Sequence, residues 1–187
     1  MIISISGSLG SGKSTAAKNL AKQLNYKHYS TGDFWRELAA RRNLDVYEYN
    51  KLAEIDPSID KEIDGFSGEL GKKEDDFVID SRLAWYFIPQ SYKVQFEIDP
   101  YEGAKRIFLH SQQTNRGNEK RYENIEKTME AIKKRDESEK QRFLSLYNAD
   151  ITNPNNYDLV INTTNLTPEQ VVEKILDSLP EDEIRKI

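Results

Sequence analysis

The residues best suited to chemistry form a glycine-rich segment near the N-terminus. They fit the pattern Gly-x-x-x-x-Gly-Lys-Ser/Thr, with an apolar run before them and an amphipathic stretch after them. Glycines in such a loop let backbone N–H groups converge on phosphate oxygens, and the helix that follows directs its positive dipole end at the same anion. The spacing therefore predicts that ATP phosphates are bound by Gly7, Ser8, Leu9, Gly10, Ser11, Gly12, Lys13, Ser14 and Thr15.

A hydroxyl group and a carboxylate are candidates to hold Mg²⁺ beside these phosphates. Ser14 ends the motif, and the hydroxyl at this position is the usual metal ligand, while Lys13 reaches the β- and γ-phosphates. Asp80 ends the short apolar run 77–80, as does the second metal-side carboxylate of many phosphate-loop enzymes. Asp80 could instead only cap the next helix, but beside a phosphate loop we favour a Mg²⁺ site at Ser14 and Asp80.

A small kinase also needs positive charge around the transferring phosphoryl group. Two candidate arginines are seven residues apart in one predicted helix, which places them on one face about 10 Å apart along the axis. A single arginine of this kind is more often a solvated surface charge, so the prediction rests on the whole group. The candidates are Arg36, Arg82, Arg106, Arg135 and Arg142.

Other phosphate-loop classes fit less well. A GTPase needs an Asn-Lys-x-Asp segment to read guanine, whereas Asn50-Lys51-Leu52-Ala53 lacks the aspartate and falls in a predicted helix. With 187 residues, the chain is also shorter than most motor or transport ATPases. A small kinase is the hypothesis that remains.

Short apolar runs alternate with amphipathic stretches along the chain, and this alternation predicts an α/β protein with a mostly parallel sheet covered by helices. A polar segment, 112–118, is predicted to be a loop. Strands are expected at 1–6, 27–29, 77–80, 94–98 and 157–161, and helices at 13–24, 31–42, 46–53, 59–72, 100–109 and 167–179. The charged stretch 120–147 is expected to form one long helix or two.

Composition excludes several other classes of protein. The chain has 27 Lys and Arg residues against 32 Asp and Glu, a net charge of −5, which disfavours an extended nucleic-acid-binding surface. Zero Cys excludes disulfides, thiolate metal sites and a Cys nucleophile. No apolar run approaches the ~20 residues of a membrane-spanning helix, and no basic region precedes the apolar N-terminus as in a secretory signal. We expect a cytoplasmic, globular protein that binds neither nucleic acid nor membrane.

Several segments together resemble the nucleoside monophosphate kinases, and within them the cytidylate kinases of the compact, archaeal-type branch. The phosphate loop is shared by many folds and says little about the substrate. The stretch 52–64 and the segment 135–143, which is similar to the lid helix of that family, are much more specific. The similarity also covers 30–36, with the pattern Ser-x-Gly-x-x-x-Arg, as well as 80–84 and 157–163.

The resemblance implies a five-stranded parallel core and a monomeric enzyme that converts ATP and CMP or dCMP to ADP and CDP or dCDP. It implies a core at 1–33, 75–109 and 141–187, a monophosphate-binding subdomain at 34–74 and a lid at 110–140. Mg²⁺ and arginine charge would stabilise the transferring group, so the protein needs no dedicated base. The closing lid would exclude water.

The resemblance also assigns roles to the arginines. Ser30 and Arg36 belong to the monophosphate segment, and Arg36 and Arg82 would hold the acceptor phosphate. Catalysis would fall to Lys13 and to the arginines that surround the transferring phosphoryl group as the lid closes, Arg106, Arg135 and Arg142.

Two positions depart from the family pattern. Ser81 replaces a glycine between the acidic residue and Arg82, and its Cβ is expected to restrict close approach of the backbone. His110 replaces an arginine, so a fixed charge is lost there.

Asp60 and Asp64 are candidates to recognise the base or the ribose of the acceptor. They lie four residues apart, on one face of a predicted helix. Cytosine presents an amino group that donates to a carboxylate, whereas uracil presents a carbonyl oxygen there, which a carboxylate repels. The alternative is that both are solvated acids that pair with Lys61 or other nearby charges.

Two other functions stay open. One is another small phosphate-loop kinase, such as an adenylate kinase or a kinase with a nonnucleotide acceptor. The other is a nucleotide-binding assembly or regulatory protein that reuses the fold, for which an arginine cluster around the acceptor would be superfluous.

Overall fold

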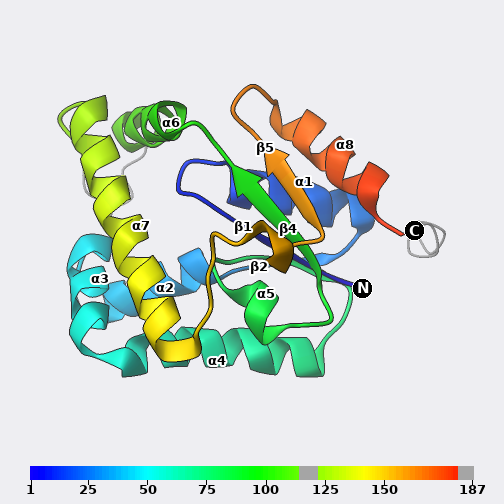
Figure 1. Cartoon of the computed structure of the whole chain (residues 1–187), viewed down its shortest axis with the longest axis horizontal. Coiled ribbons are helices and arrows are strands. Elements are labelled where there is room, and N and C mark those ends of the chain that lie inside the picture. Colours follow the sequence, from blue (N-terminus) through cyan, green and yellow to red (C-terminus); the bar gives the residue numbers. More distant parts are fainter. Residues whose placement is uncertain (114–121, 181–187) are drawn as a thin grey trace.

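The computed structural model describes residues 1–113 and 122–180. Its centre is a sheet of five parallel strands in the order β2-β3-β1-β4-β5, which confirms the predicted α/β fold (Figure 1). The strands are β1 (Ile2–Gly7), β2 (Lys27–Ser30), β3 (Phe77–Asp80), β4 (Tyr92–Glu97) and β5 (Leu159–Asn162).

The strand register brings the predicted site residues to one edge of the sheet. Asp80 at the end of β3 lies opposite Ile5 of β1 on one side and opposite Ser30 of β2 on the other. The phosphate loop leaves β1 at Gly7, between strands β3 and β4. Because the strand order reverses beside β1, this carboxyl edge is where open α/β sheets bind ligands.

Helices cover both faces of the sheet. Helices α1 (Lys13–Leu24) and α8 (Pro168–Ser178) pack on one face over a core that includes Ile3 and Phe96. On the other face Ile2 and Phe77 pack against residues of α4 (Pro57–Lys73) and of the short helix α5 (Ala84–Phe87). With both faces covered, strands β1 and β3 are buried along their whole length.

Three helices form a unit with its own core beside the sheet. Helices α2 (Thr31–Arg41) and α3 (Val46–Ile55) pack with α4 around Trp35, Tyr49 and Ile59. Each helix has an N-terminal cap; Ser30, Asp45 and Asp56 accept from the first turns of α2, α3 and α4. This unit occupies the region predicted to be the monophosphate-binding subdomain, 34–74, whose function stays a prediction.

The two remaining helices lie near the carboxyl edge of the sheet. Helix α6 (Pro100–Gln113) contains the first two residues of the segment predicted to be a loop; the rest of that segment lies outside the described residues. Helix α7 (Ile125–Tyr147) is continuous across residue 140, where the sequence places a boundary between lid and core, and it runs beside α3 and α5 (Figure 1). None of the described helices could span a membrane.

Candidate active site

A cavity of about 870 Å³ lies along the carboxyl edge of the sheet. The phosphate loop lines its centre. Leu166 and Val171, near the start of α8, line it beyond the loop on one side, and Asn50 of α3 and Asp64 of α4 line it on the other. This volume is in the range of cavities that enclose small-molecule ligands.

The phosphate loop packs so closely on its neighbours that two of its glycines cannot be replaced. A Cβ atom at Gly7 would lie 2.3 Å from the Phe96 carbonyl oxygen, and one at Gly10 would lie 2.4 Å from that of Gly103. Both residues also have positive φ angles, 143° and 81°. The loop is thereby fixed against β4 and α6.

Lys13 spans the phosphate loop from the start of α1. Its Nζ donates to the carbonyl oxygens of Gly7 and Ser8, at 2.7 and 2.8 Å. Burial, assisted by the positive charge of Arg82, lowers the pKa of Lys13 to about 7. Because burial disfavours the charged form of Lys13, a bound phosphate would strongly stabilise the ammonium group.

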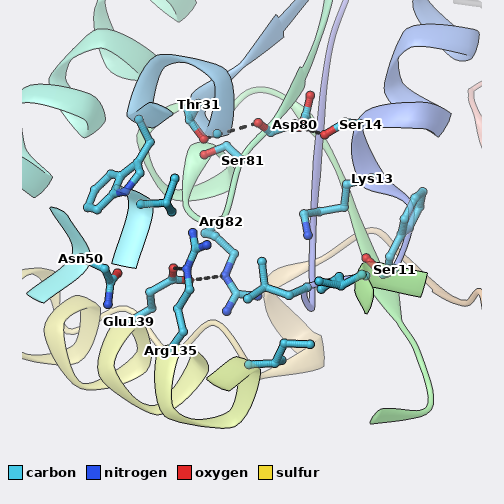
Figure 2. A pocket seen from close by; sticks show the side chains of 18 of the residues that line it. Ser11, Lys13, Ser14, Thr31, Asn50, Asp80, Ser81, Arg82, Arg135 and Glu139 are labelled. Carbon is cyan, nitrogen blue, oxygen red and sulfur yellow. Dashed lines mark hydrogen bonds and ion pairs between the residues drawn. The ribbon is translucent and has the colours of Figure 1, made fainter. Parts of the chain in front are cut away.

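Asp80 is the centre of a buried polar cluster (Figure 2). Its Oδ2 accepts from Ser14 Oγ at 2.7 Å, the contact drawn in Figure 2. The same oxygen accepts from Ser30 Oγ at 3.0 Å, and Oδ1 lies 2.6 Å from His28 Nε2. Burial alone would raise the pKa of Asp80, but the hydrogen bonds from His28 and Ser14 lower it overall. An ionised carboxylate beside a hydroxyl group is the oxygen donor set that Mg²⁺ prefers, so the residues fit the metal.

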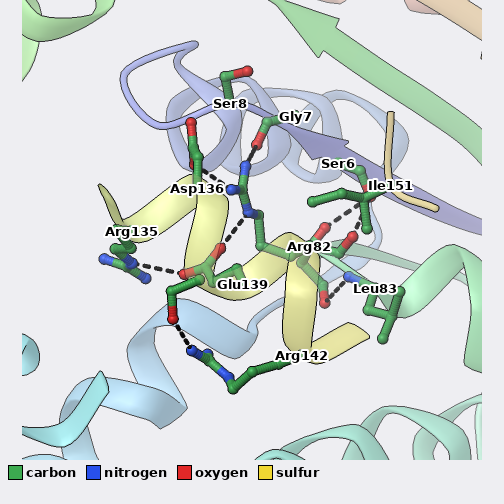
Figure 3. Close-up of polar contacts among 12 residues, drawn as sticks. Ser6, Gly7, Ser8, Arg82, Leu83, Arg135, Asp136, Glu139, Arg142 and Ile151 are labelled. Atoms are coloured by element: carbon green, nitrogen blue, oxygen red, sulfur yellow. Dashed lines mark hydrogen bonds and ion pairs between the residues drawn. The ribbon is translucent and has the colours of Figure 1, made fainter. Parts of the chain in front are cut away.

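Arg82 joins the phosphate loop to helix α7 (Figure 3). Its guanidinium donates to Gly7 O at 2.8 Å, to Glu139 Oε2 at 2.6 Å and to Asp136. Arg135 donates from Nε to the other oxygen of Glu139, at 2.7 Å. Burial would raise the pKa of Glu139, but the charges of Arg82 and Arg135 lower it to about 2. One buried carboxylate thus holds two of the predicted arginines.

Arg142 has different partners, although it lies on the same helix. Its Nε donates to Asp60 Oδ2 at 2.8 Å, and its terminal nitrogens donate to Ser138 Oγ at 2.7 Å and to Asn50 Oδ1 at 3.3 Å. The structure therefore divides the predicted arginine group: Arg135 shares Glu139 with Arg82, whereas Arg142 contacts α3 and α4.

The other two arginines of the predicted group also line the cavity. Arg36 forms an ion pair of 2.5 Å with Asp33. Arg106 donates to the carbonyl oxygens of Thr163 and Thr164, at 3.2 and 2.9 Å. Its Nε also donates to Glu102 Oε1 on the same helix, at 3.3 Å. Among the described residues these partners are not shared with Arg135 or Arg142, and the role of Arg106 at the transferring phosphoryl group stays a prediction.

Asp60 and Asp64 both line the cavity and are buried, with only 3% and 7% of their surface exposed. This burial excludes the alternative that they are solvated surface acids. Burial raises the pKa of Asp64 to about 7, and the neighbouring Tyr147 hydroxyl offsets part of this increase. The raised pKa of Asp60 has the same first cause, partly offset by Arg142.

The two departures from the family pattern have separate environments. The Ser81 hydroxyl accepts from the backbone N–H groups of Leu83 and Ala84, at 3.2 and 3.1 Å, and so caps α5. This side chain is turned towards its own backbone, which explains why the serine is accommodated. His110 lines the cavity from α6.

Sequence reasoning missed three polar residues of this cavity region, His28, Asn50 and Glu139. Their spacing carries a signal: Glu139 is one turn from Arg135 on a helix face, and His28 precedes Ser30 by two residues in a strand, which puts both on one side. Asn50 belongs to the segment 50–53, which does not match a guanine-binding motif, and its sequence context gives no other signal.

Comparison with known proteins gives consistent results. A family model described as the Cytidylate kinase-like family matches residues 2–165. The chain is 37% identical to a cytidylate kinase of Halobacterium salinarum, over 96% of this chain and 89% of that protein. It is 35% identical to a cytidylate kinase of Archaeoglobus fulgidus, over 100% and 97%. A shikimate kinase from Bacteroides thetaiotaomicron is similar in structure, with a TM-score of 0.64, 14% identity and coverage of 95% and 97%, which supports the fold alone.

Proposed function

The chain belongs to the cytidylate kinase-like family, and from that premise we propose that it transfers the γ-phosphoryl group of ATP to CMP or dCMP. The products are ADP and CDP or dCDP. The observation that carries the proposal is a single cavity with a phosphate loop at its centre and two buried aspartates beyond it. Such a cavity can hold two nucleotides with their phosphates in contact.

Donor binding rests on the phosphate loop, where backbone N–H groups and Lys13 bind the phosphates of ATP. Ser14 and Asp80 would hold Mg²⁺, since their oxygens lie 2.7 Å apart at the end of the loop. The metal, when bound, neutralises charge that develops on the β- and γ-phosphates. Thr15 follows on α1 and, with Ser8, Leu9 and Ser11, completes the predicted ATP site.

The acceptor phosphate is assigned to Arg36 and Arg82, with Ser30 beside them. Arg82 already holds a fixed position through Gly7 O and Glu139, so its orientation costs little when the phosphate arrives. Arg135, held by the same glutamate, adds positive charge near the point of transfer. The protein thus accelerates transfer by alignment and charge rather than by a base.

Base selection is assigned to Asp60 and Asp64, which are the buried carboxylates at the α4 wall of the cavity. A carboxylate there accepts from the exocyclic amino group of cytosine. We further propose a cytoplasmic monomer that binds neither nucleic acid nor membrane. The net charge of −5 supports the exclusion of nucleic acid.

An acceptor panel tests the proposal. The purified chain is mixed with ATP and Mg²⁺ and with CMP, dCMP, UMP, AMP or shikimate, and the products are separated by ion-exchange chromatography. We expect CDP and dCDP as the main products. Turnover of AMP or of a nonnucleotide acceptor but not of CMP would show that the enzyme acts on a different class of acceptor. Binding of ATP and CMP without formation of CDP in a single turnover would indicate a regulatory protein.

A further inference from the structure

Lys13 and Arg82 lie side by side at the start of the phosphate loop, because the carbonyl oxygen of Gly7 accepts from both. The distances are 2.7 Å from Lys13 Nζ and 2.8 Å from the Arg82 guanidinium. Both side chains line the cavity, where the proposed function brings the phosphates of donor and acceptor together. Two positive charges this close repel each other, so they require negative charge nearby, from the protein or from a ligand.

Two carboxylates of helix α7 provide this negative charge (Figure 3). Arg82 donates from Nε to Glu139 and from Nη2 to Asp136, which lies three residues earlier on the helix. Burial would lower the pKa of Arg82, but the charges of Glu139 and Asp136 raise it overall. Burial also lowers the pKa of Lys13, and Asp80, Glu139 and Asp136 offset part of that decrease. Asp136 therefore acts on both cations.

The two carboxylates of α7 differ in how firmly the protein holds them. The side chain of Glu139 is 5% exposed and also accepts from Arg135, whereas that of Asp136 is 34% exposed. Within residues 1–113 and 122–180, the Asp136 carboxylate accepts a hydrogen bond from Arg82 alone. A partly exposed carboxylate with one partner is exchanged for another anion at a lower cost than a buried one. Asp136 is thus the partner of Arg82 that a ligand replaces more readily.

We infer that Asp136 takes, on Arg82, the place of the acceptor phosphate, and that its displacement by this phosphate favours transfer to the acceptor over transfer to water. The inference rests on the proposed function, in which Arg82 binds the acceptor phosphate, and it deepens that function. Asp136 acts through Arg82 and does not contact the reacting atoms, so it is a positioning residue that determines specificity.

Water is the competing acceptor in a kinase site. In hydrolysis a water oxygen bonds to the γ-phosphorus, the bond to the β,γ-bridging oxygen breaks, and ADP, inorganic phosphate and a proton are released. With ATP alone, Arg82 stays paired with Asp136, so its charge stabilises the transferring phosphoryl group poorly. The acceptor phosphate carries about two negative charges against one on Asp136, and so it takes over the guanidinium.

A purely structural role is the alternative, in which Asp136 only fastens α7 beside the phosphate loop. Loss of the carboxylate would then destabilise the fold and slow hydrolysis and transfer alike. Competition predicts a different pattern. Hydrolysis without acceptor increases relative to transfer, and KM for CMP decreases, because the phosphate no longer has to displace a carboxylate from Arg82.

The experiment measures ATP hydrolysis without acceptor, and kcat and KM for CMP, in the wild type and in Asp136→Asn. We expect the ratio of hydrolysis to CMP-dependent turnover to rise by about tenfold and KM for CMP to fall by about three- to tenfold. Asp136→Glu, which keeps the charge, should keep a ratio near that of the wild type. An unchanged ratio in Asp136→Asn, or an increased KM for CMP, would overturn the inference.

Glu137→Gln is the matched control, because Glu137 is the exposed neighbour of Asp136 on α7. It removes one carboxylate from the same helix and is expected to change neither the ratio nor KM for CMP. A rise of the ratio in Glu137→Gln equal to that in Asp136→Asn would assign the effect to the net charge of the helix and would overturn the inference.

A second measurement uses the wild type alone, in case the substitution weakens the fold. Crystal structures are determined with ADP and with ADP plus CMP. We expect the contact between Arg82 and Asp136 in the ADP complex and its loss in the complex with both nucleotides, while the contact between Arg82 and Glu139 persists in both. An Arg82–Asp136 contact that persists beside bound CMP would overturn the inference.

The outcomes separate the two proposals. If the wild type phosphorylates neither CMP nor dCMP, both the proposed function and the inference fail. If it phosphorylates CMP and Asp136→Asn keeps the wild-type ratio of hydrolysis to transfer, the inference alone fails.

Discussion

Arg82 Nε donates a hydrogen bond of 2.6 Å to Glu139 Oε2, although 57 residues separate the two in sequence. The same guanidinium donates to Gly7 O at 2.8 Å, and the second oxygen of Glu139 accepts from Arg135. A single buried carboxylate thus couples the phosphate loop to helix α7 and orients two arginines. Its removal is expected to affect both folding and transfer.

The variant Glu139→Gln tests this coupling. An amide of the same shape leaves Arg82 without its main counter-charge in a buried position, so the free energy of unfolding is expected to fall by about 3 kcal/mol. We expect kcat to fall by about tenfold or more for every acceptor, because two arginines lose their anchor. Urea unfolding and steady-state kinetics measure the two effects.

The exposed Glu130→Gln, on the same helix, serves as the control and is expected to change stability by less than about 0.5 kcal/mol. The pH dependence gives a second check. The pKa of Glu139 is about 2 in the folded protein against 4.5 ordinarily, so its stabilisation is present above pH 4.5 and disappears as pH falls towards 2. A wild type and Glu139→Gln with parallel stability curves between pH 5 and 2 would contradict this role.

Sequence periodicity was sufficient to predict the sheet and most helices. The helix Lys13–Leu24 and the strand Phe77–Asp80 have the predicted limits, because a phosphate-loop motif and a fully apolar run define them. Helix α5 was missed, since its four residues Ala84–Phe87 are too few for a period and it depends on the cap from the Ser81 hydroxyl. Local signals thus predict long elements better than short capped ones.

The site was predictable where strand ends determine it. Asp80 and Ser30 end neighbouring strands, so the hydrogen bonds that Asp80 accepts from Ser30 and from Ser14 follow from the carboxyl edge of a parallel sheet. The partners of Arg82 and Arg142 were not predictable, because they depend on how α7 meets the segment that follows β3 and helix α4. Equal spacing on a helix could not show that the two arginines of α7 have different partners.

Lys13→Ala is expected to lower kcat by at least about 1,000-fold, because the β- and γ-phosphates lose their principal cation. Lys18→Ala, exposed on the same helix, is the control and is expected to keep normal turnover. Since the pKa of Lys13 is about 7, much of it is neutral at pH 8, and a bound phosphate raises that pKa. ATP binding at pH 8 should therefore take up protons.

Calorimetric titration with ATP in buffers of different ionisation enthalpy measures this proton uptake. The uptake is expected to disappear in Lys13→Ala and to persist in Lys18→Ala. Unchanged turnover in Lys13→Ala would remove the loop lysine from the mechanism, and equal uptake in both variants would assign the protons to another group.

Asp64→Asn should increase stability at high pH while it weakens acceptor recognition. The pKa of Asp64 is about 7 in the folded protein against 3.8 ordinarily, so the folded state binds more protons between these values and loses stability as pH rises. The free energy of unfolding of the variant should therefore increase relative to that of the wild type as pH rises from 4 to 7, by up to about 3 kcal/mol. Unfolding curves across this range measure the gain.

Asp177→Asn, exposed on α8, is the control, and its difference from wild type should not follow this pH range. If the difference in unfolding free energy between Asp64→Asn and wild type did not change with pH, the Asp64 carboxyl group would be ionised in the folded protein without a loss of stability. If Asp60→Asn and Asp64→Asn both kept the preference for CMP over UMP, neither aspartate would read the base.

His28 is expected to position Asp80 for the metal. The Nε2 atom lies 2.6 Å from Oδ1 of Asp80, while Oδ2 accepts from Ser14 and Ser30, so the imidazole fixes the carboxylate plane. His28→Ala is expected to weaken binding of ADP in the presence of Mg²⁺ by about tenfold, and His28→Gln, which keeps a donor, by less. Binding of ADP with EDTA present should be unchanged in both variants, since the phosphate loop itself is intact. Equal weakening with and without Mg²⁺ would instead indicate that His28 supports the fold around β2, and a matching loss of thermal stability would confirm that reading.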